Sequence, residues 1–410
     1  MSAAAANGSV CVSGVTAHVG WSRQAKFVIA LCFLLNMIDG MDILVMSYIA
    51  PSLQRDWSVT PGAFAIVFSA GLGGMAIGGL AIAPLADRFG RRRLILFALP
   101  LMATAMIASS YADTVAHLVL ARIVVGIGIG TVLACIAALA AEFAPADRRN
   151  FAVGILQGGY PVGATVTGLL TAWALPHLQW HGVLLGTGLV TLAVLPLAWW
   201  QLPETPRLAA AAGKVTLSDA IGGARLTPSL LLWSATICGF MALYFVASWI
   251  TKLAIEAGLP ETQAIVASAI YNIGAFFGVL GMSLAASRFD IRMIACTLLI
   301  AAAGAFLWFG GVKMSVAWVL IAAFVLGMTL QGGFNALYPL AARVYPARVR
   351  ATGIGWAMGL GRIGAFTGPL IGGWALGAKL PLVAVFGFFC LPLVIAATCA
   401  RAVTFGEIEE

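Results

Sequence analysis

Charged side chains are scarce in this chain: Asp, Glu, Lys and Arg make up 9% of its 410 residues. A soluble domain carries about a quarter. Hydrophobic residues make up 61% of the chain, and a soluble fold of this length has no interior large enough to bury them. The 47 glycines fit the same interpretation, because membrane helices tolerate glycine and use it for close packing. The composition therefore predicts an all-α membrane protein.

The chain also lacks the motifs of ATP-driven transport, metal binding and catalysis. The glycines of Gly126–Ile127–Gly128–Ile129–Gly130 lie in an apolar stretch and are not followed by the Lys-Ser/Thr of a nucleotide-binding loop. The seven cysteines show no CxxC spacing, and most lie in apolar runs. We therefore expect no cofactor and no bound metal, and we predict that the protein is not an enzyme.

Twelve apolar stretches approach the length of about 20 residues that a bilayer-spanning helix needs. They lie near residues 26–50, 62–86, 93–111, 115–141, 150–174, 181–201, 229–254, 262–286, 292–311, 315–341, 351–376 and 381–400. We predict twelve transmembrane helices in two six-helix bundles. The expected parts are an N-terminal cytoplasmic tail (1–22), a first bundle (23–201), a cytoplasmic linker (202–228), a second bundle (229–402) and a C-terminal tail (403–410).

The distribution of Lys and Arg predicts the orientation. One set of loops, with the tails and the linker, holds 17 of the 23 basic residues, and Arg122 and Arg362 fall within spans. The opposite loops carry Arg55, Lys252, Lys313 and Lys379. Because basic loops stay on the cytoplasmic side, both termini are expected there. The positive charge thus reflects topology and contact with lipids, and we expect no nucleic-acid partner.

The two halves of the sequence resemble each other. Leu85–Ala86–Asp87–Arg88–Phe89–Gly90–Arg91–Arg92 closes the second span, and Ala285–Ala286–Ser287–Arg288–Phe289–Asp290–Ile291–Arg292 closes the eighth, 200 positions later. Such repeats are typical of two-bundle transporters with a site between the halves. The second copy departs from the first, with Ser287 in place of Asp87 and Asp290 in place of Gly90.

These motifs carry a family resemblance. Asp87–Arg88–Phe89–Gly90–Arg91–Arg92 resembles the loop signature of the major facilitator superfamily, and Arg122–Ile123–Val124–Val125–Gly126 resembles its span-four motif. Asp39–Gly40–Met41–Asp42 in the first span is similar to the signature of the aromatic acid:proton symporter family. The resemblance implies proton-coupled import of a small, hydroxybenzoate-like aromatic carboxylate by alternating access. It also implies a bacterial inner-membrane protein that acts as a monomer.

Three charged residues within the spans are candidates for proton coupling. Asp39 and Asp42 are three positions apart and are expected on one helix face. Their mutual repulsion and burial both disfavour ionisation, so at least one is expected to exchange a proton. Arg122 must find an anion, and it either changes partner during transport or holds spans four and one in a fixed ion pair. The alternative for the acids is a structural role beside Gly40.

Candidate substrate-binding residues are polar or aromatic and lie in several spans. Arg362 either binds an anionic substrate or extends towards a lipid headgroup. Aromatic rings suit a benzoate-like ligand, and amides suit its ring hydroxyls. We predict that this group includes Arg362, Asn335, Tyr338, Trp249, Asn272, Gln157, Gln331 and Trp356, with Tyr160 and Tyr271 as further candidates.

Asp87, Arg88, Arg92 and Glu142 are the candidate gating residues. In the superfamily the loop Asp faces the start of span eleven, and the loop Arg meets an acid that closes span four. The resemblance therefore implies an Arg88–Glu142 ion pair that breaks when the halves move apart. The alternative is that the basic residues only anchor the loop on the cytoplasmic side.

Other functions stay open at this point. Within the transporters, the rivals are a carrier of another organic acid or a sugar, and a drug/proton antiporter. Gly158–Gly159–Tyr160–Pro161–Val162–Gly163 is only loosely similar to the antiporter pattern. A membrane sensor or membrane enzyme is a rival of another class. It is disfavoured because the largest soluble segment is Leu202–Thr227.

Overall fold

The computed structural model describes residues 22–145, 149–203, 221–222, 225–311, 315–346 and 349–405. Most of the predicted tails and linker therefore lie outside the described residues. The described part of the first half contains α1 (Arg23–Asp56), α2 (Pro61–Ile77), a π-helical and a 3₁₀ segment (Gly78–Ile82 and Ala83–Leu85), α3 (Ala86–Phe89), α4 (Arg91–Ser110), α5 (Val115–Phe143) and α6 (Arg149–Gln201). That of the second half contains α8 (Leu226–Glu256), α9 (Glu261–Ala285), α10 (Ile291–Gly311), α11 (Val316–Asn335), α12 (Leu337–Val344), α13 (Arg350–Gly377) and α14 (Leu382–Ala402).

Several helices begin at hydroxyl side chains that cap free backbone amides. The side chain of Ser22 accepts a hydrogen bond from the amide of Ala25, Thr60 accepts one from Ala63, and Thr114 accepts one from His117. Capping of this kind satisfies amides that have no partner within the helix. The starts of α1, α2 and α5 are thus fixed by local sequence.

Among the described residues, ten helices are long and apolar enough to cross a membrane. One of them, Gly154–Gln201, has 48 residues, enough for two crossings. It is interrupted at Gln179, whose φ of 54° is not helical. Helix α13 is not among the ten because its glycines and Arg362 lower its hydropathy, yet its 28 residues pack along the others. With the long helix counted twice and α13 added, the described chain makes twelve crossings.

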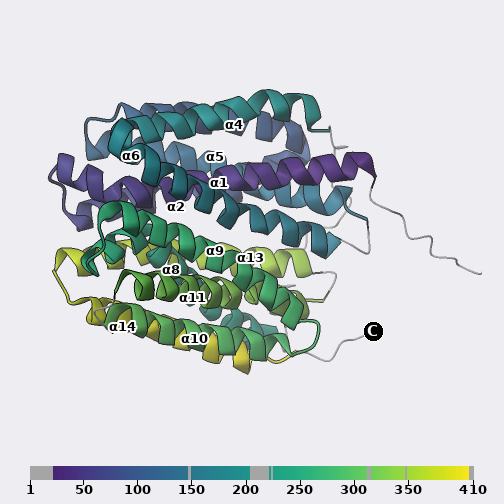
Figure 1. The fold of residues 1–410 in the computed structure, drawn as a ribbon. Helices are drawn as coiled ribbons and strands as arrows, with labels where there is room; N and C mark the ends of the chain where they lie inside the picture. Colours follow the sequence, from purple (N-terminus) through teal and green to yellow (C-terminus); the bar gives the residue numbers. More distant parts are fainter. Residues whose placement is uncertain are drawn as a thin grey trace, which may run out of the picture.

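The two halves repeat the same helix packing (Figure 1). In the first half α1 packs against α6 and α2 against α5, while in the second half α8 packs against α13 and α9 against α11. The outer helices follow the same rule, with α4 on α6 and α10 on α14. The sequence repeat is therefore also a repeat of architecture.

Glycines bring the central helices of each half together. A Cβ atom on Gly40 of α1 would collide with the backbone of Tyr160 on α6. The matching contact in the second half joins Gly364 of α13 to the backbone of Ile237 on α8. Close approach of this kind is what small residues permit in membrane helices.

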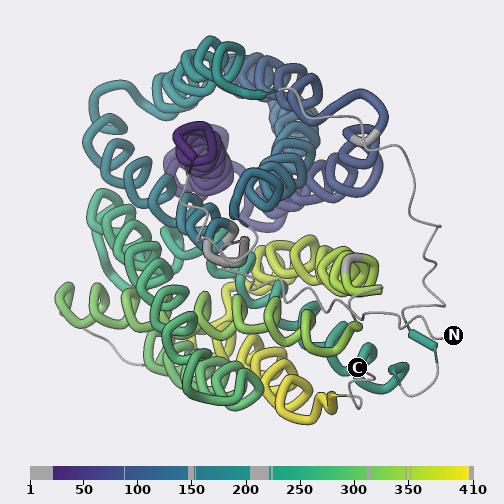
Figure 2. The backbone as a smooth tube through the Cα atoms, turned by 90° about the vertical axis from the view of Figure 1, so that its right-hand side faces the viewer, coloured from purple at the N-terminus to yellow at the C-terminus, as the bar shows by residue number. Residues whose placement is uncertain are grey.

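The halves lie side by side, seen end-on in Figure 2, and meet along α2 and α13, α6 and α9, and α1 and α8. Ser69 on α2 donates a hydrogen bond to the carbonyl of Phe366 on α13 at 2.9 Å. Near the end of α1, Arg55 forms an ion pair with Glu261 at the start of α9. Residues from both halves are therefore positioned to face a shared central space.

Candidate functional site

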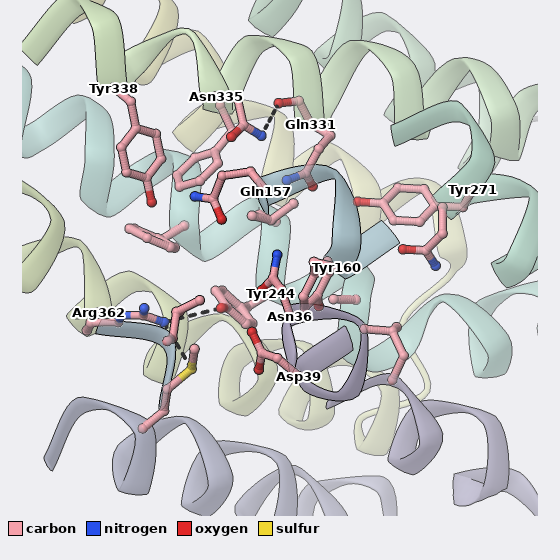
Figure 3. Close-up of a pocket in the computed structure, with 18 residues that line it drawn as sticks. Asn36, Asp39, Gln157, Tyr160, Tyr244, Tyr271, Gln331, Asn335, Tyr338 and Arg362 are labelled. Atoms are coloured by element: carbon pink, nitrogen blue, oxygen red, sulfur yellow. Dashed lines mark hydrogen bonds between the residues drawn. The ribbon is translucent and has the colours of Figure 1, made fainter. Parts of the chain in front are cut away.

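A cavity lies between the two halves (Figure 3). The first half lines it with Asn36, Asp39, Leu44, Met75, Leu133, Gln157 and Tyr160. The second half lines it with Phe240, Leu243, Tyr244, Ala247, Tyr271, Asn272, Gln331, Phe334, Asn335, Tyr338 and Arg362. Aromatic rings, amides and one acid–base pair thus converge on one space.

The structure brings most of the predicted substrate-binding residues together here. Arg362, Asn335, Tyr338, Asn272, Gln157 and Gln331 line the cavity, as do Tyr160 and Tyr271. Helix geometry explains part of this set. Gln331 and Asn335 are four positions apart on α11, and the side chain of Asn335 donates to the carbonyl of Gln331 at 2.9 Å. Their contact with a substrate stays a prediction.

Trp249 and Trp356 do not line this cavity, contrary to the sequence-based prediction. Trp249 is fully buried, its indole N–H donates to the carbonyl of Pro369 at 3.0 Å, and its ring packs against Phe68. Trp356 has 43% of its surface exposed and is not one of the residues that line the cavity. Trp249 therefore helps to join the halves, and neither ring forms part of the cavity wall.

Arg362 is a cation that makes no ion pair with another described residue. Its guanidinium donates to the hydroxyl of Tyr244 and to the sulfur of Met75, both at 3.2 Å, and lies 5.3 Å from the centre of the Phe240 ring. Asp39 is the acid whose charge acts on it. A partly buried guanidinium among neutral partners is suited to binding a carboxylate, because its planar fork matches the two oxygens.

Asp39 faces the cavity from α1. It is 5% exposed, and its Oδ1 atom has no hydrogen-bond partner among the described residues. The neighbouring Gly40 sets its position, since the contact of Gly40 with Tyr160 fixes α1 against α6. A buried carboxyl oxygen without a hydrogen-bond partner is costly to leave unsatisfied, and Asp39 therefore stays a candidate for binding a proton.

Asp42 has different surroundings from Asp39, although the two were expected on one face. Asp42 is fully buried, and neither of its carboxyl oxygens has a hydrogen-bond partner in the described chain. Arg122 on α5 donates to the backbone carbonyl of Asp42 at 2.8 Å and lines a second, smaller cavity. The charge of Arg122 acts on Asp42 and that of Arg362 acts on Asp39, while the charge of Asp39 also acts on Asp42. Each acid therefore has its own arginine, and the two acid–arginine pairs remain electrostatically coupled.

The loop after the second span differs from the predicted gate. Glu142 forms its ion pair with Arg91, whereas the guanidinium of Arg88 lies 5.5 Å from the centre of the Phe89 ring. The reason is the turn at Gly90, whose φ of 91° ends α3 and makes Arg91 the first residue of α4. Arg92 donates to the carbonyl of Trp199 at 2.7 Å. The side chain of Asp87 lies outside the described part of the structure.

The corresponding loop of the second half forms its ion pair internally. The guanidinium of Arg292 donates to Asp290 at 2.6 and 2.9 Å and also to the carbonyl of Val403 at 3.3 Å. The Arg292 hydrogen bonds hold the pKa of Asp290 below its ordinary value. Asp290 stands where the first copy has Gly90, and it holds Arg292, which connects this loop to the end of α14.

Two polar cavity residues, Asn36 and Tyr244, were not among the predicted site residues. Asn36 lies one helical turn before Asp39 on α1, and this spacing was a usable signal. Tyr244 had no such signal, because a tyrosine in an apolar span can face any direction. Among the described residues, no group of three or more His, Cys, Asp or Glu side chains is arranged to hold a metal ion.

Twelve crossings in two repeated halves around a polar central cavity define a membrane transporter. The chain belongs to the Major Facilitator Superfamily, whose model matches residues 32–316 and 232–408. The fold is shared with solved transporters. A bacterial homologue of the human lysosomal transporter Spinster has a TM-score of 0.74 at 18% identity, covering 94% of this chain and 97% of that one. The xylose transporter XylE of E. coli has a TM-score of 0.72 at 17% identity, covering 94% and 98%.

Curated relatives are transporters of aromatic acids. The gallate transporter of Pseudomonas putida is 31% identical, over 92% of this chain and 91% of its own length. The 4-hydroxybenzoate transporter PcaK of Acinetobacter baylyi is 29% identical, over 92% and 90%. The 3-(3-hydroxy-phenyl)propionate transporter of Escherichia coli is 31% identical, over 92% and 93%. These findings confirm the predicted fold class and family resemblance, and identify a transporter family, not an enzyme family.

Proposed function

We propose that the protein imports a small aromatic carboxylate, of the hydroxybenzoate type, together with protons. The observation that carries the proposal is Arg362. It is a cation without an ion pair in the described chain, and it faces a central cavity lined by aromatic rings and amides. The relatives named for gallate and 4-hydroxybenzoate support the same class of substrate.

The cavity offers a partner for each part of such a molecule. In this proposal the carboxylate binds the guanidinium of Arg362. The ring lies among the side chains of Phe240, Tyr244 and Tyr338, which favour offset or edge-on contact. The ring hydroxyls meet the amides on the opposite wall, where Gln331 and Asn335 lie in Figure 3. An acid without hydroxyl groups would leave the amides without partners.

Proton coupling follows from the position of Asp39. When its carboxyl group is ionised, it competes with the substrate carboxylate for Arg362. Protonation removes this competition, so the substrate anion and the proton bind together. Asp42 and Arg122 contribute from the neighbouring pair, where protonation of Asp42 changes the charge balance of buried Arg122. Coupled binding of this kind is reciprocal: each ligand strengthens the other.

The repeated halves are proposed to act as two rigid bundles, 23–201 and 229–402, that rock around the cavity. The excess of basic residues in one set of loops supports a cytoplasmic location of both termini, in a bacterial inner membrane. Arg88, Arg92, Asp87 and Glu142 belong to the cytoplasmic end, where the Arg91–Glu142 pair strengthens the first bundle. We propose that the carrier works as a monomer, because each chain contains a complete cavity.

Uptake into proteoliposomes tests the proposal. Purified protein is reconstituted, and labelled benzoate, 4-hydroxybenzoate, gallate, a sugar acid and a sugar are offered with and without an inward proton gradient. We expect gradient-driven accumulation of one or more hydroxybenzoates, abolished by a protonophore. Accumulation of the sugar or sugar acid alone would refute the substrate class, and outward pumping under the same gradient would indicate antiport.

A further inference from the structure

The central cavity shares a wall with the smaller cavity that contains Arg122. Met75 of α2 and Tyr244 of α8 line both spaces. Ser248, one turn after Tyr244 on the same helix, lines the smaller cavity. Tyr244 therefore lies between the two acid–arginine pairs, Asp39–Arg362 and Asp42–Arg122.

Tyr244 also determines where the guanidinium of Arg362 lies. Its hydroxyl accepts a hydrogen bond from Nη1 of Arg362 at 3.2 Å, and the same nitrogen donates to the sulfur of Met75 at 3.2 Å. The ring of Tyr244 is held in place because it stacks on Phe240, with 5.8 Å between the ring centres. In Figure 3 the Tyr244 hydroxyl lies between Arg362 and the rest of the cavity, and the carboxyl group of Asp39 lies beside it. Arg362 Nη1 thus donates to Tyr244 and Met75, and no hydrogen bond joins it to Asp39 within the described chain.

We propose that Tyr244 is a positioning residue for transport: its hydroxyl holds Arg362 out of a closed ion pair with Asp39 and so keeps the guanidinium available to the substrate carboxylate. The inference rests on the proposed function. Without the hydroxyl, the freed donor of Arg362 has Asp39 as its nearest anion. An ion pair between Asp39 and Arg362 would occupy the guanidinium that binds the substrate carboxylate, and it would also hold Asp39 in its ionised form.

Other groups near Asp39 do not supply this restraint. The titratable and charged groups that interact with it or with its neighbour Asp42 are Arg362 on α13, Tyr244 on α8, Tyr160 on α6 and Arg122 on α5. Arg122 is bonded to the backbone of Asp42. The hydroxyl of Tyr271 is buried without a hydrogen-bond partner in the described chain, so removing it should not release a charged group.

The test is a double-mutant cycle on equilibrium binding. Binding of radiolabelled 4-hydroxybenzoate to the purified carrier is measured for wild type, Tyr244→Phe, Asp39→Asn and the double variant, at pH 6 and pH 8. We expect Tyr244→Phe to weaken binding roughly tenfold or more, the usual effect of losing a hydrogen bond to a charged group. The loss should be larger at pH 8, and it should vanish when Asp39 is replaced by Asn, because no anion then competes for Arg362.

Tyr345→Phe is the control, since it removes a hydroxyl that is buried without a hydrogen-bond partner in the described chain and lies outside the cavity, and it should leave binding and its pH dependence unchanged. Tyr244→Leu also removes the hydroxyl, and it replaces Tyr244→Phe in the cycle if that variant does not fold. An equal loss in both Asp39 backgrounds, or no loss in either, overturns the inference alone. If the wild type binds none of the aromatic acids offered in the uptake experiment, the proposed function is overturned and this inference falls with it.

Discussion

Asp39 on α1 and Arg362 on α13 face one cavity from opposite halves of the molecule, and no hydrogen bond joins them within the described chain. Arg362 instead donates to two neutral groups, and Asp39 leaves a carboxyl oxygen without a partner. An acid and a base so placed can each bind a ligand. Asp39 and Arg362 can then be joined in an ion pair or stay apart, and binding of the substrate or the proton favours the separated state.

Replacing Asp39 by Asn should separate substrate binding from proton coupling. Asn is nearly the same size and carries no charge, so Arg362 stays available to the substrate. We expect gradient-driven accumulation to be lost and counterflow exchange of labelled substrate to be kept. Both are measured in the same proteoliposomes, with Asn36→Ala as a control that changes another cavity residue on α1. Full accumulation by Asp39→Asn would show that the proton binds elsewhere.

Asp42 and Arg122 should behave as one buried unit. Their charges interact although no ion pair joins their side chains, so removing one charge leaves the other less compensated. Asp42→Asn should therefore lower the melting temperature of the purified protein by several degrees, and adding Arg122→Met should recover part of that loss. Asp39→Asn serves as the comparison and should change the melting temperature less. Equal losses in all three variants would contradict the separation into two pairs.

The Arg91–Glu142 ion pair can be distinguished from the Arg88–Glu142 pair that the family resemblance implies. Glu142→Gln and Arg91→Gln should each lower stability by about 1 kcal/mol or less, since the pair is partly exposed, and the double variant should lose no more than either single variant. When Glu142→Gln is combined with Arg88→Gln, the losses of stability should add. If the losses add for Arg91 and not for Arg88, Glu142 pairs with Arg88, as the family resemblance implies, and the structure is contradicted.

Gly40 is expected to tolerate no side chain. Gly40→Ala would place a methyl group against the backbone of Tyr160, and overpacking of this kind costs about 1–3 kcal/mol. The yield of folded protein and substrate binding should both fall, because α1 and Asp39 move together. Gly304→Ala on α10 is the matched control: its Cβ meets no atom within 4 Å, and alanine is the better helix former. Normal folding of Gly40→Ala would contradict the close contact of α1 with α6.

Much of the fold can be predicted from the sequence because each bilayer-spanning helix needs a long apolar segment. Apolar runs, the basic loops and the repeat of Leu85–Arg92 at Ala285–Arg292 together define twelve crossings. Charged residues within spans also stand out, since burial makes them costly, and so Asp39 and Arg362 were identified from sequence. The amides at 331 and 335 followed from their polarity and helical spacing.

Other features depend on helix rotation, which the sequence does not record. Trp249 is as plausible a substrate contact as Tyr338 until α8 is placed against α2, where its ring packs on Phe68. The partner of Glu142 depends on the turn at Gly90, because one position more or less changes which arginine begins α4. The different surroundings of Asp39 and Asp42 likewise follow from neighbouring helices, not from their spacing.

The most direct test of competition between Asp39 and the substrate for Arg362 is the pH dependence of equilibrium binding. Binding of radiolabelled 4-hydroxybenzoate is measured between pH 6 and pH 8, where the substrate stays ionised, for wild type and Asp39→Asn. As the pH rises, Asp39 of the wild type loses its proton and competes for Arg362, so affinity should fall, whereas that of Asp39→Asn should stay constant. A wild-type affinity independent of pH, or a pH dependence unchanged in Asp39→Asn, would contradict the account.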